Sequence, residues 1–496
     1  MNNTNLNPDG QVLKTTNDSS KRPLLVLLTS HWVSMLGVAL VTTAGFSWLF
    51  VLPTEIRGHT SNPYIGIVVF ILIPVIFVLG LVLIALGMFL ARRRIIRAEH
   101  DCFVAGDRRT YIRKLAIFFA VTTAANIVIG TQGTYRAVEH METPQFCGQS
   151  CHVMKPEYTA HQNSPHARVE CVDCHVAPGA VGWAESKKAG TRQLIDTVFK
   201  RVHYPIESAI ESNRLVPARE TCEGCHWPQM FDAVKLRVIF HFKDDAANTQ
   251  TQTALMMLTG GGALGGIHGK HLGPGVEIHY AAADPKRQTI SWVEYRNRNT
   301  GQTQTFLADG STAQSVATLP RYQMQCVDCH NRPTHTFELP ERAVDNAMGL
   351  GQISTTLPFI KKKAVELLKA NYSSNQDASR AIPASLANFY KQSYPAIASK
   401  RSKDIANAGS QIAAIYNRNV FPDLKVTWGT YPNNLGHADF PGCFRCHDGS
   451  HSTSDQKVTI SQDCNACHEP LAIEEASPGI LKTLGLQDRI ASLQKQ

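Results

Sequence analysis

The chain has 496 residues, and a prior of about 100–200 residues per domain predicts roughly three domains. Charged residues make up 18% and hydrophobic residues 43% of the sequence, which excludes a disordered or collagen-like chain. The formal net charge is +9, but residues 1–114 hold 12 basic and 6 acidic groups, so most of the excess lies in the N-terminal quarter. The remainder shows no basic stripe, and nucleic-acid binding is therefore not expected.

Three apolar runs occupy the N-terminal quarter of the chain. Residues 24–52 and 64–91 are each longer than the ~20 residues that cross a bilayer as a helix. The third run, 115–131, is shorter and contains Asn126, which needs neighbouring helices to shield its polar group. We expect three transmembrane helices, and an integral membrane protein.

The loops between these runs predict their orientation. Eight Lys and Arg residues lie between positions 92 and 114, whereas the first short loop has only Arg57. Basic residues concentrate on the cytoplasmic side, so the N-terminal tail (1–23) is expected in the cytoplasm and everything after about residue 131 in the periplasm of a bacterial inner membrane. The first run is too long for the core of a cleaved signal, and it is expected to be an uncleaved anchor.

Six motifs follow the third run, and each ends in histidine. They are Cys147/Cys151-His152, Cys171/Cys174-His175, Cys222/Cys225-His226, Cys326/Cys329-His330, Cys443/Cys446-His447 and Cys464/Cys467-His468. We number them motifs 1 to 6.

Motifs 2 to 6 have the C-x-x-C-H spacing of covalent haem c attachment. The two thiols bind the two vinyl groups of one porphyrin, and the adjacent imidazole then reaches the iron from one face. Motif 1 has one extra residue and can bridge the vinyl groups only if its loop bulges. Zinc also binds Cys and His, but six copies in an oxidising compartment favour haem over zinc or disulfides. The thirteenth thiol, Cys102, lies in the predicted cytoplasmic loop.

Haem iron in an electron carrier usually has a second axial ligand, commonly His or Met. The predicted periplasmic part holds eleven further histidines: His140, His161, His166, His203, His241, His268, His271, His279, His335, His437 and His451. From these we select His166, His203, His241, His335, His437 and His451 as candidate ligands. His335 and His451 follow their own motifs too closely to cross the same haem, so they are expected to serve a neighbouring one. Met154, directly after motif 1, is a further candidate.

The segments between motifs predict additional structure. Residues 276–307 alternate apolar and polar side chains around a turn at 299–301, which predicts antiparallel strands. Residues 360–370, 384–392 and 403–417 have helical periodicity, with breaks expected at Pro383 and Pro395.

The stretch Gly260–Gly265 matches G-x-G-x-x-G, but it lacks the strand–helix context of a dinucleotide site. It is expected to be a flexible loop.

The predicted organisation is a mainly α, membrane-anchored multihaem cytochrome c with a haem-packed extracytoplasmic domain and a small β insertion. We divide it into a cytoplasmic tail (1–23), a three-helix anchor (24–131), a domain with motifs 1 to 3 (132–230), a β-containing insertion (231–320), a segment with motif 4 (321–340), a helical insertion (341–430) and a C-terminal segment with motifs 5 and 6 (431–496).

The run Cys151-His152-Val153-Met154-Lys155-Pro156-Glu157-Tyr158, followed by Ser164-Pro165-His166 and motif 2, resembles the NapC/NirT family of membrane-anchored multihaem cytochromes. The likeness covers about 115–196, and the later motifs are similar to larger inner-membrane members of that family. Usual members have one anchor helix and four haems, whereas this sequence predicts three helices and six motifs.

The resemblance implies a quinol site beside the first haem. Met154 matches the family's methionine ligand, and Lys187 or Lys188 with Asp196 lie where charged quinol-site residues are expected. The implied function is oxidation of menaquinol or ubiquinol from the membrane quinone pool, with electrons passing through six covalently bound haems to periplasmic cytochromes or a reductase. Two alternatives remain open: a terminal reductase acting at a haem with an open face, and an anchor or electron-transfer subunit of a separate reductase.

Overall fold

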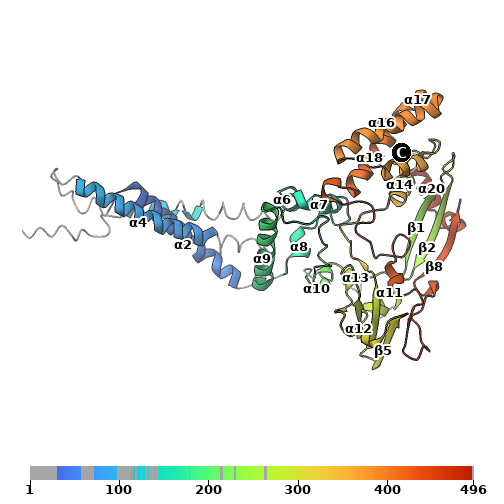
Figure 1. Cartoon of the computed structure of the whole chain (residues 1–496), viewed down its shortest axis with the longest axis horizontal. Coiled ribbons are helices and arrows are strands. Elements are labelled where there is room, and N and C mark those ends of the chain that lie inside the picture. Colours follow the sequence, from blue (N-terminus) through green and yellow to red (C-terminus); the bar gives the residue numbers. More distant parts are fainter. Residues whose placement is uncertain are drawn as a thin grey trace, which may run out of the picture. The chain divides into compact units, whose positions relative to one another are not determined.

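The computed structural model describes residues 31–56, 72–97, 143–150, 152–177, 179–212, 216–227, 231–261 and 265–493, with 113, 116–117, 120–124, 126–128, 132 and 140. It divides into two units (Figure 1). The first comprises Met1–Glu142 and Pro178–Thr191, and the second comprises Thr143–Ala177 and Arg192–Gln496. Cys102, Cys151 and much of the third apolar run lie outside the described residues.

In the first unit, helices α2 (Trp32–Ile56) and α4 (Ile73–Arg97) pack closely along glycines. A methyl group at Gly37 would lie 2.6 Å from the carbonyl oxygen of Gly80, and one at Gly87 would overlap Ser34 of α2. Such small residues let apolar helices approach backbone to backbone, which is how membrane helices gain dispersion contacts. Glycine at these positions is therefore required by the helix contact.

One helix among the described residues, 73–91, is long and apolar enough to cross a membrane, and the apolar part of α2, Trp32–Ser47, is shorter. The third predicted span, 115–131, is described only in part, with helical residues at 116–117, 120–124 and 126–128. There the amide of Asn126 donates to the carbonyl of Ala39 (3.3 Å) and to the hydroxyl of Thr42 (3.2 Å). The polar group expected to need shielding is thus bonded to α2.

In the second unit, each motif lies on or beside a short helix or 3₁₀ turn. These are α6 (Pro144–Ser150), η2 (His152–Met154), α8 (Cys171–His175), α10 (Ala218–Cys222), α13 (Cys326–Cys329), η6 (Gly442–Arg445) and η7 (Cys464–Ala466). Helix α7 (Lys155–Gln162) follows motif 1. Helix α9 (Gly179–Val198), which follows motif 2, begins in the first unit and ends in the second. In both α8 and α13 the motif aspartate completes a capping box, which fixes the start of the turn.

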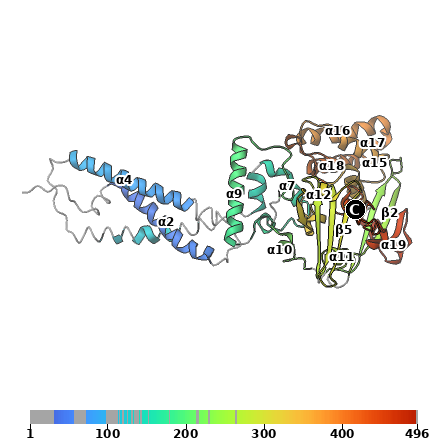
Figure 2. The same ribbon diagram turned by 60° about the horizontal axis from the view of Figure 1, so that its bottom comes forward.

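The second unit contains two antiparallel sheets (Figure 2). The first has the order β1-β2-β8 and the second the order β6-β3-β4-β5-β7. Their bounds are β1 (Lys235–Phe242), β2 (Gln250–Met257), β3 (Val276–Ala282), β4 (Ile290–Asn297), β5 (Gln302–Ala308), β6 (Arg321–Gln323), β7 (His451–Ser452) and β8 (His468–Glu475).

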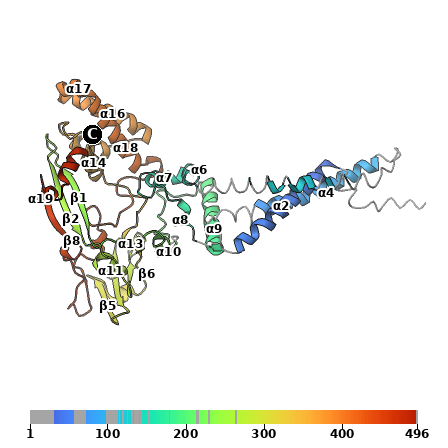
Figure 3. The same cartoon turned by 180° about the vertical axis from the view of Figure 1, so that it is seen from behind.

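The strands expected at 276–307 are confirmed as β3 to β5. The β structure is nevertheless larger than the small insertion that the sequence predicted. Strands β7 and β8 come from the C-terminal segment, more than 140 residues after β5, and β8 hydrogen-bonds to β2 (Figure 3). Periodicity within one segment cannot reveal a strand partner that distant.

The helical insertion comprises α14 (Pro340–Gly349), α15 (Ile360–Lys369), α16 (Asn375–Ser393), α17 (Pro395–Lys400) and α18 (Ser402–Asn419). The break expected at Pro383 is wrong, because Pro383 lies inside α16. Ile382, Leu386 and Tyr390 are fully buried in one hydrophobic core with α18, and Gly409 of α18 leaves room for the proline ring. Tertiary packing thus outweighs the lost backbone hydrogen bond.

The remaining short elements connect these parts. They are α11 (Gly266–Leu272), α12 (Ala313–Val316), η5 (Pro422–Leu424), α19 (Gly479–Thr483) and α20 (Gln487–Leu493).

A buried ion pair lies within the helical insertion, and its carboxylate is also bonded to the first sheet. Lys361 of α15 lies 2.5 Å from Asp345 of α14, and both residues are almost fully buried. The same carboxylate accepts the backbone amide of Phe242 at the end of β1 (3.2 Å). Removing one partner of such a pair leaves an uncompensated buried charge.

We expect Asp345→Ala to lower the free energy of unfolding by about 3–5 kcal/mol, because Lys361 is left without its counter-ion. The matched control is Asp439→Ala, which removes a surface partner of Arg342 and is expected to cost at most about 1 kcal/mol. Thermal unfolding of the detergent-solubilised protein, followed by circular dichroism, compares the two. Equal decreases in the unfolding temperature of the two variants would contradict the stabilising role assigned to the buried pair.

Candidate haem-binding centre

Each histidine of motifs 2 to 6 faces a second histidine from elsewhere in the second unit. The ring centroids are 5.8–6.3 Å apart in all five cases. The pairs are His175–His335 (6.1 Å), His226–His166 (5.9 Å), His330–His268 (6.3 Å), His447–His271 (5.8 Å) and His468–His437 (6.1 Å).

This separation has a simple chemical meaning. A metal–nitrogen bond of about 2 Å on each side, with about 1.2 Å from nitrogen to ring centre, puts two axial imidazoles about 6 Å apart across one metal. Direct ring stacking would bring the centroids closer, as it does for His437 and Phe444 at 4.1 Å. The five gaps therefore fit one iron each.

Hydrogen bonds select which ring nitrogen could bind that iron. In four partner histidines Nδ1 lies near a backbone carbonyl: His166 at Pro333 (3.4 Å), His335 at Glu157 (3.0 Å), His268 at Gly260 (3.1 Å) and His271 at Ile267 (2.7 Å). A carbonyl can only accept, so Nδ1 must carry the proton. Nε2 is then left with its lone pair, as axial ligation requires.

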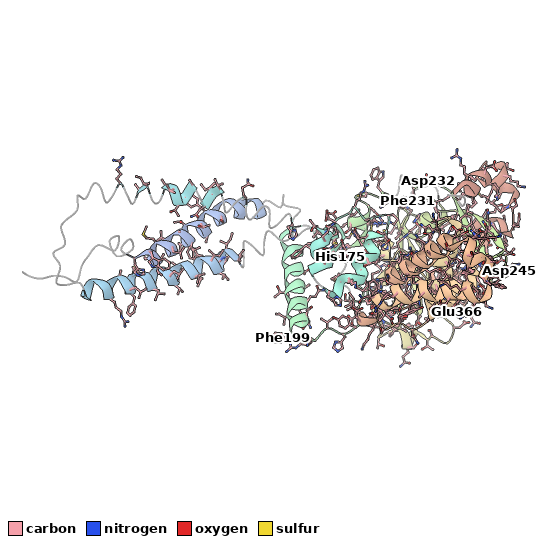
Figure 4. The ribbon with its side chains drawn as sticks, turned by 90° about the horizontal axis from the view of Figure 1, so that it is seen from above. His175, Phe199, Phe231, Asp232, Asp245 and Glu366 are labelled. Atoms are coloured by element: carbon pink, nitrogen blue, oxygen red, sulfur yellow. The ribbon has the colours of Figure 1, made fainter. Side chains whose placement is uncertain are left out.

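Desolvation by the surrounding protein favours the neutral form of the motif 2 pair, which is the form that can bind a metal. His175, labelled in Figure 4, lies on α8. This desolvation lowers the pKa of both His175 and His335 to about 4, so both imidazoles are neutral at pH 7. Nearby, Glu157 of α7 contacts Nδ1 of His335 (3.1 Å) and Arg332 (3.4 Å), and burial raises the pKa of its carboxyl group.

Motif 1 differs from the other five. Nε2 of His152 lies 2.9 Å from the carboxylate of Asp423 in η5, and both side chains are largely exposed. Within the described ranges, no imidazole faces His152 at the 6 Å spacing of the other pairs. Met154 ends η2 two residues after His152 and is half-buried.

The structure brings three of the six selected histidines to a motif, namely His166, His335 and His437. His335 faces motif 2. The sequence predicted a partner other than motif 4, because His335 follows His330 by only five residues. His451 is buried with Nε2 bonded to the carbonyl of Ile290 (3.0 Å) and Nδ1 to Ser450 (3.2 Å), so neither nitrogen is available to a metal.

The other two selected histidines are not brought to a motif histidine among the described residues. His241 is half-exposed and lies 3.4 Å from Asp345, and His203 is exposed. His161 approaches His335 to 6.5 Å, but its Nε2 lies 3.0 Å from the carbonyl of Val169.

His268 and His271 were among the eleven candidates but were not selected from the sequence. They face motifs 4 and 5, and both lie on the seven-residue helix α11. Their i, i+3 spacing, which puts both side chains on one side of a helix, was the signal that could have found them.

The residues expected at a quinol site lie on α9. Lys188 is exposed, and Asp196 is 3.9 Å from Arg192 in an i, i+4 pair. The side chain of Lys187 lies outside the described residues.

The motif thiols are neighbours in chain order. A hydrogen bond with Cys147 of motif 1 raises the pKa of Cys171 in motif 2, and a bond with Cys326 of motif 4 raises the pKa of Cys222 in motif 3.

Between the other pairs of consecutive motifs, a thiol of one motif raises the pKa of a thiol of the other by charge repulsion. Burial raises the pKa of Cys174, and Cys225 of motif 3 adds to that shift. Burial likewise raises the pKa of Cys329 to about 12, with a contribution from Cys443 of motif 5, which also adds to the shift of Cys467 in motif 6. Each motif therefore has a thiol near enough to a thiol of the next motif to affect its pKa.

Comparison with known proteins agrees with this geometry. A model of the NapC/NirT cytochrome c family, N-terminal region, matches residues 109–221. The cytochrome c-type protein ImcH of Geobacter sulfurreducens is 38% identical over 447 residues, which cover 88% of this chain and 87% of that protein. The cytochrome c-type protein NrfH of Wolinella succinogenes is 26% identical over 111 residues, 22% of this chain and 62% of that protein. No solved structure matches the chain.

The motifs and the imidazole pairs define a c-type cytochrome, an electron-transfer protein with covalently bound haem c. The chain belongs to the NapC/NirT family of membrane-anchored cytochromes, as the resemblance around motifs 1 and 2 predicted.

Proposed function

We propose that this protein is an inner-membrane cytochrome that oxidises quinol and passes electrons through six haems, one at each motif, to periplasmic acceptors. The observation that carries this proposal is the contrast between motif 1 and the other five. Five motif histidines face a second imidazole, which leaves no ligand position for a substrate. His152 has no such partner among the described residues, and Met154 is the nearby alternative ligand.

Bound haem supplies an iron that takes up and releases one electron at a time. In this proposal each of five haems would be held by a motif histidine and by the histidine that faces it. The motif histidines are His175, His226, His330, His447 and His468. The adjacency of motifs 1 to 6 supports a single line of electron transfer that begins at motif 1 and ends at motif 6.

Quinol gives up two electrons and two protons, so its site needs charged side chains that bind the quinol and help its protons leave. We assign Lys187, Lys188 and Asp196 of α9 to this site, because of their position in the sequence after motif 2. The electrons go singly to the haem chain, and the protons leave to the aqueous side.

We further propose three transmembrane helices with the N-terminus in the cytoplasm and the haem domain in the periplasm. The basic segment between residues 92 and 114 supports this orientation. The bonds from Asn126 to α2 support a third helix packed on the first.

Replacing His335 tests the axial pairs. We expect His335→Ala to convert one haem from six-coordinate low-spin to high-spin without loss of haem, because the thioether bonds of motif 2 hold the porphyrin covalently. Low-spin signals in electron paramagnetic resonance, integrated per chain against total covalent haem, measure this. The control His203→Ala removes an exposed candidate histidine and is expected to leave every signal unchanged; a loss there would contradict the pairs.

Replacing the α9 residues tests the quinol site. A side chain positioned for proton transfer contributes on the order of 100-fold to a rate, so Lys188→Ala and Asp196→Asn are expected to slow haem reduction by a menaquinol analogue by about that factor. Reduction by dithionite is expected to reach the same extent as in the unchanged protein. Lys457→Ala, at an exposed lysine of the C-terminal segment, is the matched control. Unchanged rates in both α9 variants would refute the assignment, and turnover of nitrite or hydroxylamine would favour a reductase.

A further inference from the structure

Gly260, after β2, and Gly266, at the start of helix α11, pack closely against each other. Gly260, Gly265 and Gly266 all have positive φ (58°, 69° and 65°). A methyl group at Gly266 would lie 2.7 Å from the carbonyl oxygen of Leu258, and one at Gly260 would overlap the carbonyl oxygen of Gly265. Residues with side chains rarely adopt this backbone conformation, and at Gly260 and Gly266 they also lack space.

This close approach fixes the start of α11 to the end of β2. The backbone amide of Ile267 donates to the carbonyl of Leu258 (2.9 Å), and that of His268 donates to Thr259 (2.9 Å). The end of β2 is also bonded to motif 6, because the amide of Leu258 donates to the carbonyl of Cys467 (2.9 Å). The helix therefore has a rigid base although it has only seven residues.

The same glycines orient the ligands that α11 carries. The carbonyl of Gly260 accepts Nδ1 of His268, and the ring of Phe231, labelled in Figure 4, lies 4.7 Å from the His268 ring. His271 is bonded to the carbonyl of Ile267 within the helix (2.7 Å). Both histidines thus have Nδ1 bonded to a carbonyl, which leaves the lone pair of Nε2 for a metal. Each ring lies near a motif histidine, His268 near His330 (6.3 Å) and His271 near His447 (5.8 Å).

The attachment loops of motifs 4 and 5 are also joined to each other. Arg445 of motif 5 donates to the backbone carbonyl of Asp328 in motif 4 (2.5 Å) and to that of Arg287 (2.8 Å). Asp328 is buried and accepts from Arg287 (3.2 Å) and from the hydroxyl of Tyr280. The two motif histidines are therefore held together on one side, as the two α11 histidines are on the other.

We propose that α11 is a single element that supplies the second axial ligand to two neighbouring haems, those of motifs 4 and 5. In this proposal Gly260, Gly265 and Gly266 are positioning residues for both ligands. The proposal rests on the proposed function, because it presupposes haem at these two motifs. It gives the G-x-G-x-x-G stretch a role that is unrelated to nucleotides. It also couples the two haems mechanically, since neither ligand can move without the other.

The test compares Gly266→Ala with single changes at the ligands. His268→Ala and His271→Ala are each expected to convert one haem per chain to high-spin. Gly266→Ala leaves both histidines in the sequence, yet it is expected to convert two haems at once, because the added methyl group displaces the whole helix. The matched control is Gly301→Ala, which also has positive φ (73°) but has no atom within 4 Å of the added methyl group. The readouts are low-spin signals per chain and covalent haem content.

The outcomes separate this proposal from the proposed function. Conversion of both haems in Gly266→Ala, with full covalent haem and an unchanged Gly301→Ala, supports it. An unchanged spectrum in Gly266→Ala, or conversion of only one haem, overturns it while leaving the haem chain intact. If Gly266→Ala is not produced in folded form, the double variant His268→Ala/His271→Ala decides: loss of fewer than two low-spin signals overturns the proposal. Absence of low-spin haem from the unchanged protein would instead refute the proposed function.

Discussion

The second unit depends on one geometric constraint, which is that two imidazoles must face each other about 6 Å apart with their metal-binding nitrogens unprotonated. Five pairs meet this distance. In each pair one imidazole is supplied locally, because it directly follows the second cysteine of its motif. The other must be delivered by the fold. Backbone carbonyls at Pro333, Glu157 and Gly260 then bind Nδ1 of the delivered ring and fix its tautomer.

This constraint explains why the chain needs its long insertions. Motif 6 ends where β8 begins, and His468 pairs with Met257 of β2 across the first sheet. The end of β2 also carries α11 with the partners of motifs 4 and 5. Three motifs are thus built around the end of one strand. The helical insertion contacts the same sheet at β1, the strand on the other side of β2 from β8. Asp345 and the hydrophobic core around Phe242 make this contact.

The membrane unit follows a different physical rule. Its helices have little hydrophobic drive to associate in lipid, so they depend on close backbone approach and on polar bonds. Gly37 and Gly80 provide the first, and Asn126 bonded to α2 provides the second. Both features can be recognised in a sequence as small or polar residues in an apolar run. Their partners, however, are decided only when the helices pack.

The sequence by itself predicted the haem attachment motifs, and it determined the family, the strands of 276–307 and most of the helical insertion. Each of these rests on short-range chemistry: two thioethers and an imidazole within six residues or fewer, or a periodicity that repeats within one element. The tertiary structure alone decided which histidine faces which motif. His175 and His335 are 160 residues apart, and His451, which looked equally suitable, is used to support a strand instead. It also decided that α16 continues through Pro383. The buried hydrophobic core around α16 offsets the free energy of the backbone hydrogen bond that the proline removes.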